Sequence, residues 1–459
     1  MLVTVSEATS RLVRKILPST FTFAILLTFL TLALGIVVER ETPLAMLDHW
    51  FAGFWDFLEF SMQMTMIVIT GYCIAVAPPV QKVISWVAKR ITTNRQALYT
   101  TMTVAAVAAY ISWGLGFILG PIFVRELRRH RQVDFPFLVA AAYGSAVAVL
   151  PAGLTVTVPL LINTPGHFLE EEIGLVPLTE TIFHPTLFGT AALLLAATVL
   201  IFTAMQPKRM RGTSLEATEP EELDIEQHAA AGAGTGTGDK QSIRSLGFGA
   251  RVDHSRVVAY TLVLAGAIVS VQWFTERGFD LDLNFLNFAF LMLGIALHGS
   301  LAKYFEVVVD GVRSAAGIIL QFHFYAGIMG MMVLSGLATT VAVALTSVST
   351  PATAGFASFL STGFLSIFIP SAGGGWGVQG DILVQLANEH DVAIPVVVAG
   401  YTLGDMWANL FNPFFALPAL GVTGLGLRDL WGYCLVMFVA YFIIASIGII
   451  VFPLLTGAV

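Results

Sequence analysis

Residues 369–381 read Ile-Pro-Ser-Ala-Gly-Gly-Gly-Trp-Gly-Val-Gln-Gly-Asp and directly continue the apolar run 355–369. The one proline and five glycines of this stretch disfavour a regular helix, because proline lacks a backbone N–H and glycine loses much freedom when it is ordered. In lipid, the freed backbone groups find no water, so such a break persists only where protein or a wet cavity surrounds it. The stretch predicts a helical membrane protein whose chain turns inside the bilayer.

The composition agrees with an all-α polytopic membrane protein. Of 459 residues, 56% are hydrophobic and 12% are charged, and the mean hydropathy is +0.81. Soluble domains carry about 25% charged residues. Apolar runs of about 20 residues, the length of a membrane-spanning helix, recur along the chain. The lipid bilayer is therefore an expected partner and nucleic acid is not, and Cys73 and Cys434 both lie in apolar runs, which makes a disulfide framework unexpected.

A polar segment divides the chain into two similar halves. Residues 206–256 hold clustered charges and a glycine-rich run, which predicts a flexible linker. The halves are expected at 1–205 and 283–459. Their motifs recur in the same order at a nearly constant offset, which indicates a repeat: Ser112–Gly116 matches Ser371–Gly375, Val133–Val139 matches Val392–Val398, and Val158–Leu161 matches Leu417–Leu420.

Basic residues, which collect in cytoplasmic loops, give each half an orientation. Lys and Arg side chains lie in both flanks of residues 97–124, so this segment is expected to enter and leave on the cytoplasmic side as a re-entrant hairpin. The flanks of the matching segment 355–382 contain neither Lys nor Arg, so this hairpin is expected to enter from outside. The repeats are therefore predicted to be inverted, and an extra helix at 257–273 supplies the inversion.

This topology predicts nine crossings of the membrane. The N-terminus and the linker are expected in the cytoplasm, and the C-terminus outside. The predicted crossings are 21–38, 59–79, 135–166, 184–205, 257–273, 283–299, 317–337, 394–424 and 430–453.

Inverted repeats with glycine-rich interruptions at corresponding places are typical of secondary transporters, whose substrate site lies near the midplane where the interruptions meet. Besides the two hairpin tips, broken helices are expected near 151–166 and 412–424. These regions contain no Lys or Arg, so a small anion held by backbone N–H groups and hydroxyls fits best. Trp113, Trp376 and Phe414 would form an apolar wall, although each aromatic ring is also compatible with ordinary packing or lipid contact.

The candidate substrate-binding residues come from the tips and the breaks. They are Ser112, Trp113, Gly114, Thr155, Asn163, Thr164, Ser371, Gly373, Gly374, Gly375, Trp376, Gln379, Asn412 and Thr423.

Asp405 is the leading candidate for the coupling ion. A charge at the bilayer centre costs about 2.5–3.5 kcal/mol, so it usually marks function or is paired. A structural hydrogen bond is the alternative. Asn409, Gln63 and Gln321 are further candidates for coupling to H⁺ or Na⁺, and no other cofactor and no resident metal are expected. His323 fits a packing role as well as a titrating one.

The sequence does not predict an enzyme. The glycines at 373–375 lack the Lys-Ser/Thr of a phosphate-binding loop, and no Gly-x-Ser-x-Gly, His-Glu-x-x-His or Cys-x-x-Cys motif is present. An anion channel and a carrier for another anion, such as a dicarboxylate, remain the alternatives. Hairpins that enter from opposite sides favour alternating access over a continuous pore.

Several longer motifs together carry a family resemblance. They are Phe60–Met64, Ile111–Gly116, Val158–Leu161, Thr164–Gly166, Gln321–Phe322, Phe324–Ile328, Pro370–Gly375, Gln379–Gly380, Ala416–Leu420, Gly424–Asp429 and Gly432–Cys434. With these motifs the chain resembles the short-chain fatty acid transporter family, of the acetoacetate and butyrate permease type, from about residue 10 to residue 450 outside the linker.

The resemblance implies uptake of short-chain fatty acids across the bacterial inner membrane by an elevator-type carrier, often a homodimer. The family pattern varies at His323 and places an acidic residue at or beside Asp405, which favours a coupling role for Asp405. A carboxylic acid is an anion near pH 7. Its entry against a negative-inside potential costs about 2.3 kcal/mol per charge per 100 mV, which predicts symport with a cation.

Overall fold

The computed structural model describes residues 20–56, 58–163, 167, 169–206, 247–278, 283–369 and 372–457, which form helices and turns with no strand. The helices of the first half are α2 (Thr20–Val38), α3 (Pro43–Gly53), α4 (Leu58–Val76), α5 (Pro78–Arg90), α6 (Asn94–Ile111), α7 (Trp113–His130), α8 (Phe135–Val149), η1 (Leu150–Ala152), α9 (Thr157–Leu161), α10 (Glu170–Ile173) and α11 (Pro185–Met205).

The later part of the chain contains a similar succession of helices. They are α13 (Phe248–Asp253), α14 (Arg256–Arg277), α15 (Leu283–His298), α16 (Leu301–Leu334), α17 (Leu337–Thr346), η3 (Pro351–Thr353), α18 (Ala354–Leu365), α19 (Ala372–Glu389), α20 (Ile394–Ala408), η4 (Pro413–Ala416), α21 (Leu417–Thr423) and α22 (Leu427–Thr456). Most of the predicted linker 206–256 lies outside the described residues.

Several described helices have the length and composition of membrane spans. The helices α11, α14 and α22 and the continuous stretch Phe135–Leu161 are long and apolar enough to cross a bilayer, and the bent pair of α4 and α5 is a fifth candidate. Ala24–Val38, Asn284–His298 and Ile319–Leu334 are shorter apolar helices. These stretches coincide with eight of the predicted crossings; α20, in the ninth, has only 15 residues, and the number of crossings stays a prediction.

The first predicted hairpin is a pair of antiparallel helices, α6 and α7. Gly116 lies against Ala109 and Gly120 lies against Ala105, so the two helices run in opposite directions from a turn at Ser112. Ser112 itself is extended, with φ −152° and ψ 126°, which separates the two helices. A Cβ at Gly116 would lie 2.7 Å from the backbone nitrogen of Ala109. This close approach therefore requires glycine.

The second predicted hairpin contains α18 and α19, joined by residues 366–371. The side chain of Gln379 on α19 connects the two helices: its Nε2 donates to Thr362 Oγ1 at 2.9 Å, and Ser361 Oγ donates to its Oε1 at 3.0 Å. The helix α18 packs along α20. There, a Cβ at Gly404 would meet the carbonyl oxygen of Phe359 and would lie 2.9 Å from the nitrogen of Gly363.

The helices α3 and α4 form one interrupted segment along α16. Gly53, at the end of α3, lies against Gly330, whereas Ile69 of α4 lies against Gly311. Residue numbers thus rise along α3 and α4 while they fall along α16, so the segment runs antiparallel to it. With 34 residues, α16 is about 51 Å long, since an α-helix rises 1.5 Å per residue. The stretch 41–58, which lies between the predicted crossings 21–38 and 59–79, therefore contains a helix that packs on α16.

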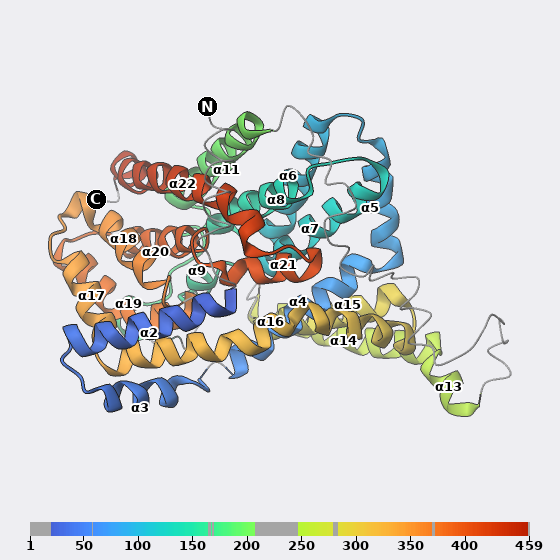
Figure 1. Cartoon of the computed structure of the whole chain (residues 1–459), viewed down its shortest axis with the longest axis horizontal. Coiled ribbons are helices and arrows are strands. Elements are labelled where there is room, and N and C mark those ends of the chain that lie inside the picture. Colours follow the sequence, from blue (N-terminus) through green and yellow to red (C-terminus); the bar gives the residue numbers. More distant parts are fainter. Residues whose placement is uncertain are drawn as a thin grey trace.

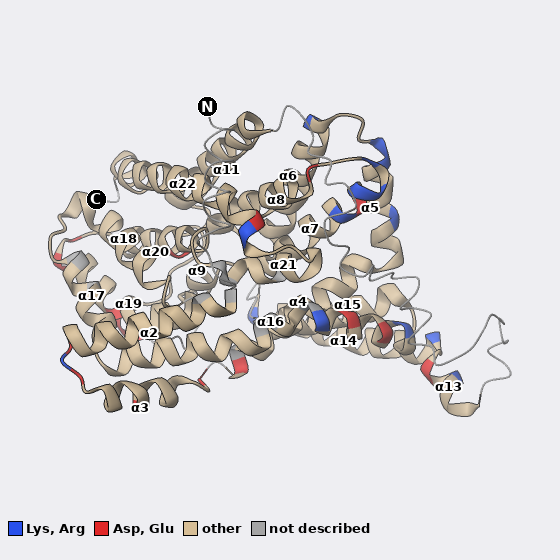
Figure 2. Cartoon of the chain, in the orientation of Figure 1, with Lys and Arg blue, Asp and Glu red and all other residues tan. Residues whose placement is uncertain are grey.

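The views of the whole molecule show how these parts are arranged. In Figure 1, α2, α3, α16, α15 and α14 extend along the lower side, and both helix pairs, α20 and α22 lie above them. Figure 2 shows Lys and Arg gathered around α5, at one end of the molecule. This distribution is compatible with the predicted cytoplasmic flanks of the first hairpin, and the inverted orientation stays a prediction.

The glycine contact between α18 and α20 can be tested through stability. We expect Gly404→Ala to lower the free energy of unfolding by about 1–3 kcal/mol, because its Cβ would push against backbone that cannot move aside. The control is Gly377→Ala on α19, where a Cβ meets nothing within 4 Å. Thermal unfolding of the purified protein in detergent measures both. An equal midpoint for Gly404→Ala and wild type would contradict this packing.

Candidate functional site

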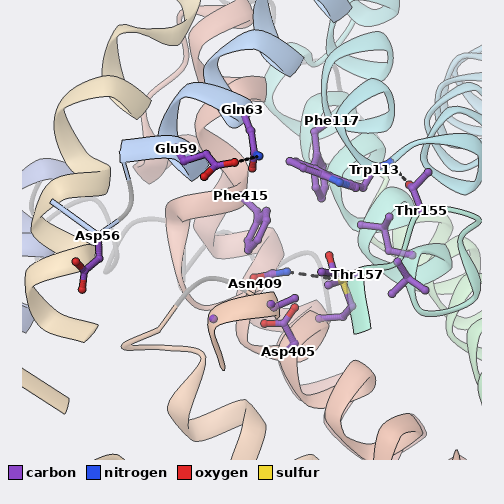
Figure 3. Close-up of a pocket in the computed structure, with 16 residues that line it drawn as sticks. Asp56, Glu59, Gln63, Trp113, Phe117, Thr155, Thr157, Asp405, Asn409 and Phe415 are labelled. Carbon is purple, nitrogen blue, oxygen red and sulfur yellow. Dashed lines mark hydrogen bonds between the residues drawn. The ribbon is translucent and has the colours of Figure 1, made fainter. Parts of the chain in front are cut away.

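A cavity of ≈ 370 Å³ lies where the interrupted segments meet. Figure 3 shows the side chains that surround it. The elements that contribute are the α3–α4 segment, the start of α7, the break between α8 and α9, the start of α19, the end of α20 and η4. The lining residues are Asp56, Glu59, Gln63, Trp113, Phe117, Leu150, Thr155, Val156, Thr157, Ala372, Gly373, Gly374, Asp405, Met406, Asn409 and Phe415.

The breaks of the first half satisfy one another's backbone groups. The backbone N–H of Trp113, the first residue of α7, donates to Thr155 Oγ1 at 3.1 Å in a buried position. Nearby, the N–H of Leu154 donates to the carbonyl of Tyr110 at 2.8 Å. The turn of the helix pair and the break after α8 are thus held together at the wall of the cavity.

Side chains close the breaks of the second half in a similar way. The Tyr401 hydroxyl donates to the carbonyl of Ala372 at 2.6 Å, and Asn412 Nδ2 donates to the carbonyl of Ile367 at 2.8 Å. The two halves are also connected, because the Tyr143 hydroxyl on α8 donates to the carbonyl of Asn409 at 2.7 Å. The backbone at the end of α20 near the cavity is therefore held by a residue of the first half of the chain.

Asp405 and Asn409 present unpaired oxygen atoms to the cavity. They lie one turn apart on α20 and are 1% and 2% exposed. Within the described residues, neither carboxylate oxygen of Asp405 nor Oδ1 of Asn409 has a hydrogen-bond partner at normal distance, although the Ser366 hydroxyl is close enough to interact with Asp405. A buried charge without a partner is costly. Such oxygen atoms are suited to binding a proton or a cation.

Aromatic rings form the apolar wall of the cavity. The ring centroid of Phe415 lies 6.0 Å from that of Trp113 and 6.3 Å from that of Phe117. In Figure 3, Phe415 lies between Glu59 and Gln63 on one side and Asn409 and Asp405 on the other. The cavity thus combines an aromatic surface with two polar ends.

The charges of the lining are all negative. Asp56, Glu59 and Asp405 line the cavity, and the lining contains no Lys, Arg or His. In the described part of the chain, no three His, Cys, Asp or Glu side chains come together as a metal site. The nearby donors that could hold an anion are therefore hydroxyls and backbone N–H groups.

Several sequence-predicted residues lie at this cavity, and others do not. Those that line it are Gln63, Trp113, Thr155, Gly373, Gly374, Asp405 and Asn409. Those that the structure describes away from its lining are Ser112, Gly114, Asn163, Gly375, Trp376, Gln379, Asn412, Thr423 and Gln321. Thr164 and Ser371 lie outside the described residues.

The residues away from the lining have structural contacts instead. Trp376 is fully buried and packs against Tyr401, with ring centroids 5.1 Å apart. Asn412 accepts a hydrogen bond from the Tyr325 hydroxyl at 3.2 Å. Thr423 Oγ1 donates to its own helix at Ala419. The side chains of Asn412 and Thr423 and the ring of Trp376 thus take part in the packing around the breaks.

The sequence reasoning missed other lining residues. They are Asp56, Glu59, Phe117, Leu150, Val156, Thr157, Ala372, Met406 and Phe415. Glu59 stands at the start of an apolar helix, and this position could have marked it. Phe415 directly follows Phe414, which was the predicted wall residue. Only the fold shows that Phe415 lines the cavity.

Comparisons with known proteins identify the family. The sequence model of the Short chain fatty acid transporter family matches residues 1–452. The chain belongs to the short-chain fatty acid transporter family. Its members are transporters, so the chain is a multi-pass membrane protein of a transporter family and not an enzyme.

Two curated relatives carry the name of short-chain fatty acid transporter. The relative from Haemophilus influenzae is 32% identical over 444 residues, which cover 95% of this chain and 96% of that protein. The relative from Escherichia coli K12 is 32% identical over 451 residues, which cover 98% of this chain and 99% of that protein. The similarity thus extends over nearly the whole length of each chain.

Two solved transporter structures show a weaker likeness. The YdaH transporter of Alcanivorax borkumensis has a TM-score of 0.47 and 13% identity over 96% of this chain and 98% of its own. MtrF of Neisseria gonorrhoeae, from a class of antimetabolite efflux pumps, has a TM-score of 0.40 and 15% identity over 95% and 97%. Both scores are below one half.

The bond between Trp113 and Thr155 can be tested with two substitutions of similar size. Thr155→Val keeps the shape of the side chain but leaves the buried N–H of Trp113 without its acceptor, which is expected to lower the free energy of unfolding by about 1–3 kcal/mol. Thr155→Ser keeps the hydroxyl and is expected to behave more like wild type. Thermal unfolding in detergent compares them. Equal stability of the Val and Ser variants would mean that another group satisfies this N–H.

Proposed function

We propose that this transporter takes up short-chain fatty acids of the acetoacetate and butyrate class across the bacterial inner membrane, coupled to H⁺ or Na⁺. The main support for this proposal is that the starts of α7 and α19 and the buried Asp405 all line one cavity. These features bring two helix N-termini and a buried carboxylate into the same small space.

The substrate carboxylate fits best beside the helix starts. The N-terminus of a helix favours an anion, by about 0.3–1 kcal/mol when exposed and up to about 2 kcal/mol when partly buried. At the start of α19, Gly373 faces Thr157, and a Cβ on this glycine would lie 3.7 Å from Thr157 Cγ2. Thr155 and Thr157 supply hydroxyls nearby, and the short carbon tail would pack against Phe415 and Trp113.

The coupling cation fits best at Asp405 and Asn409. A proton or Na⁺ there would neutralise the buried carboxylate and reduce its repulsion of the substrate anion. A first cation per monocarboxylate removes the cost of about 2.3 kcal/mol per charge per 100 mV, and any further cation would let the membrane potential drive uptake. The three carboxylates and the lack of Lys and Arg in the lining favour a monocarboxylate over a dicarboxylate.

An elevator movement would explain how the site changes sides. The helix pairs α6–α7 and α18–α19, with α8 and α20, would carry most of the cavity wall. The interrupted α3–α4 segment and α16 would form the scaffold past which this wall moves. We further propose that the two halves are inverted repeats and that the transporter is a homodimer. The N-terminus and the linker would lie in the cytoplasm, and the C-terminus outside.

Uptake of radiolabelled butyrate into proteoliposomes tests the function directly. We expect protein-dependent uptake driven by either a Na⁺ or a proton gradient, measured beside protein-free liposomes that correct for leak of the neutral acid. Absence of uptake above the protein-free value, with folded protein, would contradict the proposed substrate. Flux without counterflow would favour a channel instead.

Removing the charge of Asp405 tests the cation site. Asparagine keeps the size of the side chain but can neither take up a proton nor offer a negative charge to Na⁺, so Asp405→Asn is expected to abolish coupling to a proton gradient or to weaken Na⁺ binding by about tenfold or more. The measurement is the cation dependence of butyrate uptake. Asp381→Asn is the control, because Asp381 is exposed and does not line the cavity. An unchanged cation dependence of Asp405→Asn would exclude Asp405 as the site.

Filling the cavity from α19 tests the substrate position. A Cβ at Gly373 makes only an ordinary contact with Thr157, so Gly373→Leu is expected to fold and to project into the cavity. Uptake of butyrate should fall to the protein-free level. Gly377→Leu, on the exposed face of the same helix, is the control and should transport normally. Normal uptake by Gly373→Leu would place the substrate elsewhere.

A further inference from the structure

The interrupted α3–α4 segment brings two more carboxylates, Asp56 and Glu59, to the cavity. Gly53, which ends α3, lies against Ala326 and Gly330. Both residues belong to the apolar stretch Ile319–Leu334 of α16, well inside its ends. The interruption before Glu59 therefore lies beside the middle of an apolar helix. Glu59 is exposed beside this apolar helix, and a carboxylate within the bilayer is retained mainly in ion pathways, because it is costly in lipid.

Glu59 is held at the cavity by a polar network. Gln63 Nε2 donates to Glu59 Oε1 at 3.2 Å and to Asn284 Oδ1 at 3.0 Å, and Asn287 Nδ2 donates to the carbonyl of Gln63 at 2.9 Å. An amide positions a carboxylate but does not neutralise it. In Figure 3, Glu59 points toward Gln63 beside the cavity, whereas Asp56 lies farther out. Glu59 is therefore the better placed of the two to interact with a bound ion.

The opposite wall carries an independent feature that favours a cation, a buried carboxylate without a counter-charge among the described residues. Asp405 is 1% exposed, and its oxygens have no hydrogen-bond partner at normal distance in the described part of the chain. With a monocarboxylate bound, Glu59, Asp405 and the substrate would bring three carboxylates together, and the lining offers no Lys, Arg or His to balance them. One cation at Asp405 leaves the charge of Glu59 uncompensated.

We propose that Glu59 binds a second monovalent cation, H⁺ or Na⁺, so that two cations accompany each monocarboxylate. This inference rests on the proposed function. It makes transport electrogenic, since each cycle carries one net positive charge inward. Glu59 belongs to the α3–α4 segment of the proposed scaffold and Asp405 to the moving α20, so the two cations would bind on opposite walls of the cavity. The cation at Glu59 would therefore leave this side chain and cross with the substrate when the wall that contains α20 moves.

Other charged groups near α4 do not replace Glu59. The helices packed against α4 carry Arg125, Glu126, Arg128, Arg129 and His130 on α7, His298 on α15, Lys303, Glu306, Asp310, Arg313 and His323 on α16, and Lys82, Lys89 and Arg90 on α5. None of these side chains lines the cavity. His298 Nε2 instead contacts the carbonyl of Cys73 at 2.9 Å.

The test is the response of butyrate uptake to a potassium diffusion potential, inside negative, in proteoliposomes. We expect the potential to raise the initial rate of wild type severalfold. Glu59→Gln should still take up butyrate with its remaining cation but should lose this response. Asp48→Asn on α3, an exposed carboxylate away from the cavity, should respond as wild type does. Parallel arms with only a Na⁺ gradient and only a proton gradient identify the cation.

The outcomes separate this inference from the proposed function. Wild-type uptake that ignores the potential, or a Glu59→Gln variant that responds as strongly as wild type, would overturn the second cation and leave the transporter assignment intact. No uptake by wild type would overturn the proposed function itself.

A variant without net uptake is also informative. If Glu59→Gln takes up nothing, exchange of labelled for unlabelled butyrate at equal cation concentrations should persist, because exchange moves no net charge. Loss of exchange by a variant that elutes like wild type on gel filtration would assign Glu59 to structure or substrate binding and overturn the inference. The current that butyrate evokes from wild type on a supported membrane checks the net charge without any variant, and zero current would also overturn it.

Discussion

The hydrogen bond from the backbone N–H of Trp113 to Thr155 Oγ1 shows the constraint on which the site depends. A helix that ends within a membrane leaves backbone groups without partners, and lipid cannot supply them. Here one break supplies the partner of the other, and the N–H of Leu154 likewise donates to the carbonyl of Tyr110 across the same two breaks. The breaks must therefore lie together, and the cavity lies where they do.

The need to pair backbone groups at the breaks within the protein also explains the small and hydroxyl side chains found there. Helices can turn back on each other only if their backbones come close, which Gly116 permits in the first pair and Gly404 permits beside the second. At the cavity itself, glycines at the start of α19 leave space that a ligand can fill. The elements that make the break possible thus also make the site accessible to a small molecule.

The sequence predicted the breaks well because glycine and proline act locally. The helix end at Ser112, the turn at residues 366–368 and the acidic residue Asp405 within an apolar run follow from composition and hydropathy. Which face of a helix meets the cavity is different, because it depends on packing between distant segments. Trp376 thus pairs with Tyr401, and Gln379 joins α18 to α19, whereas both had been expected at the substrate.

Glu59 escaped prediction for a related physical reason. A charged residue at the edge of an apolar run usually marks the membrane surface, and only the register of α3 and α4 against α16 moves it toward the middle. The wall formed by α3–α4 and the wall formed by α20 therefore each carry a carboxylate. The broken helices contribute N–H groups and hydroxyls that favour an anion, and each wall adds a carboxylate that favours a cation. A cation bound to either carboxylate lowers the repulsion felt by the substrate, so the binding of cation and anion is mutually favourable without direct contact between them.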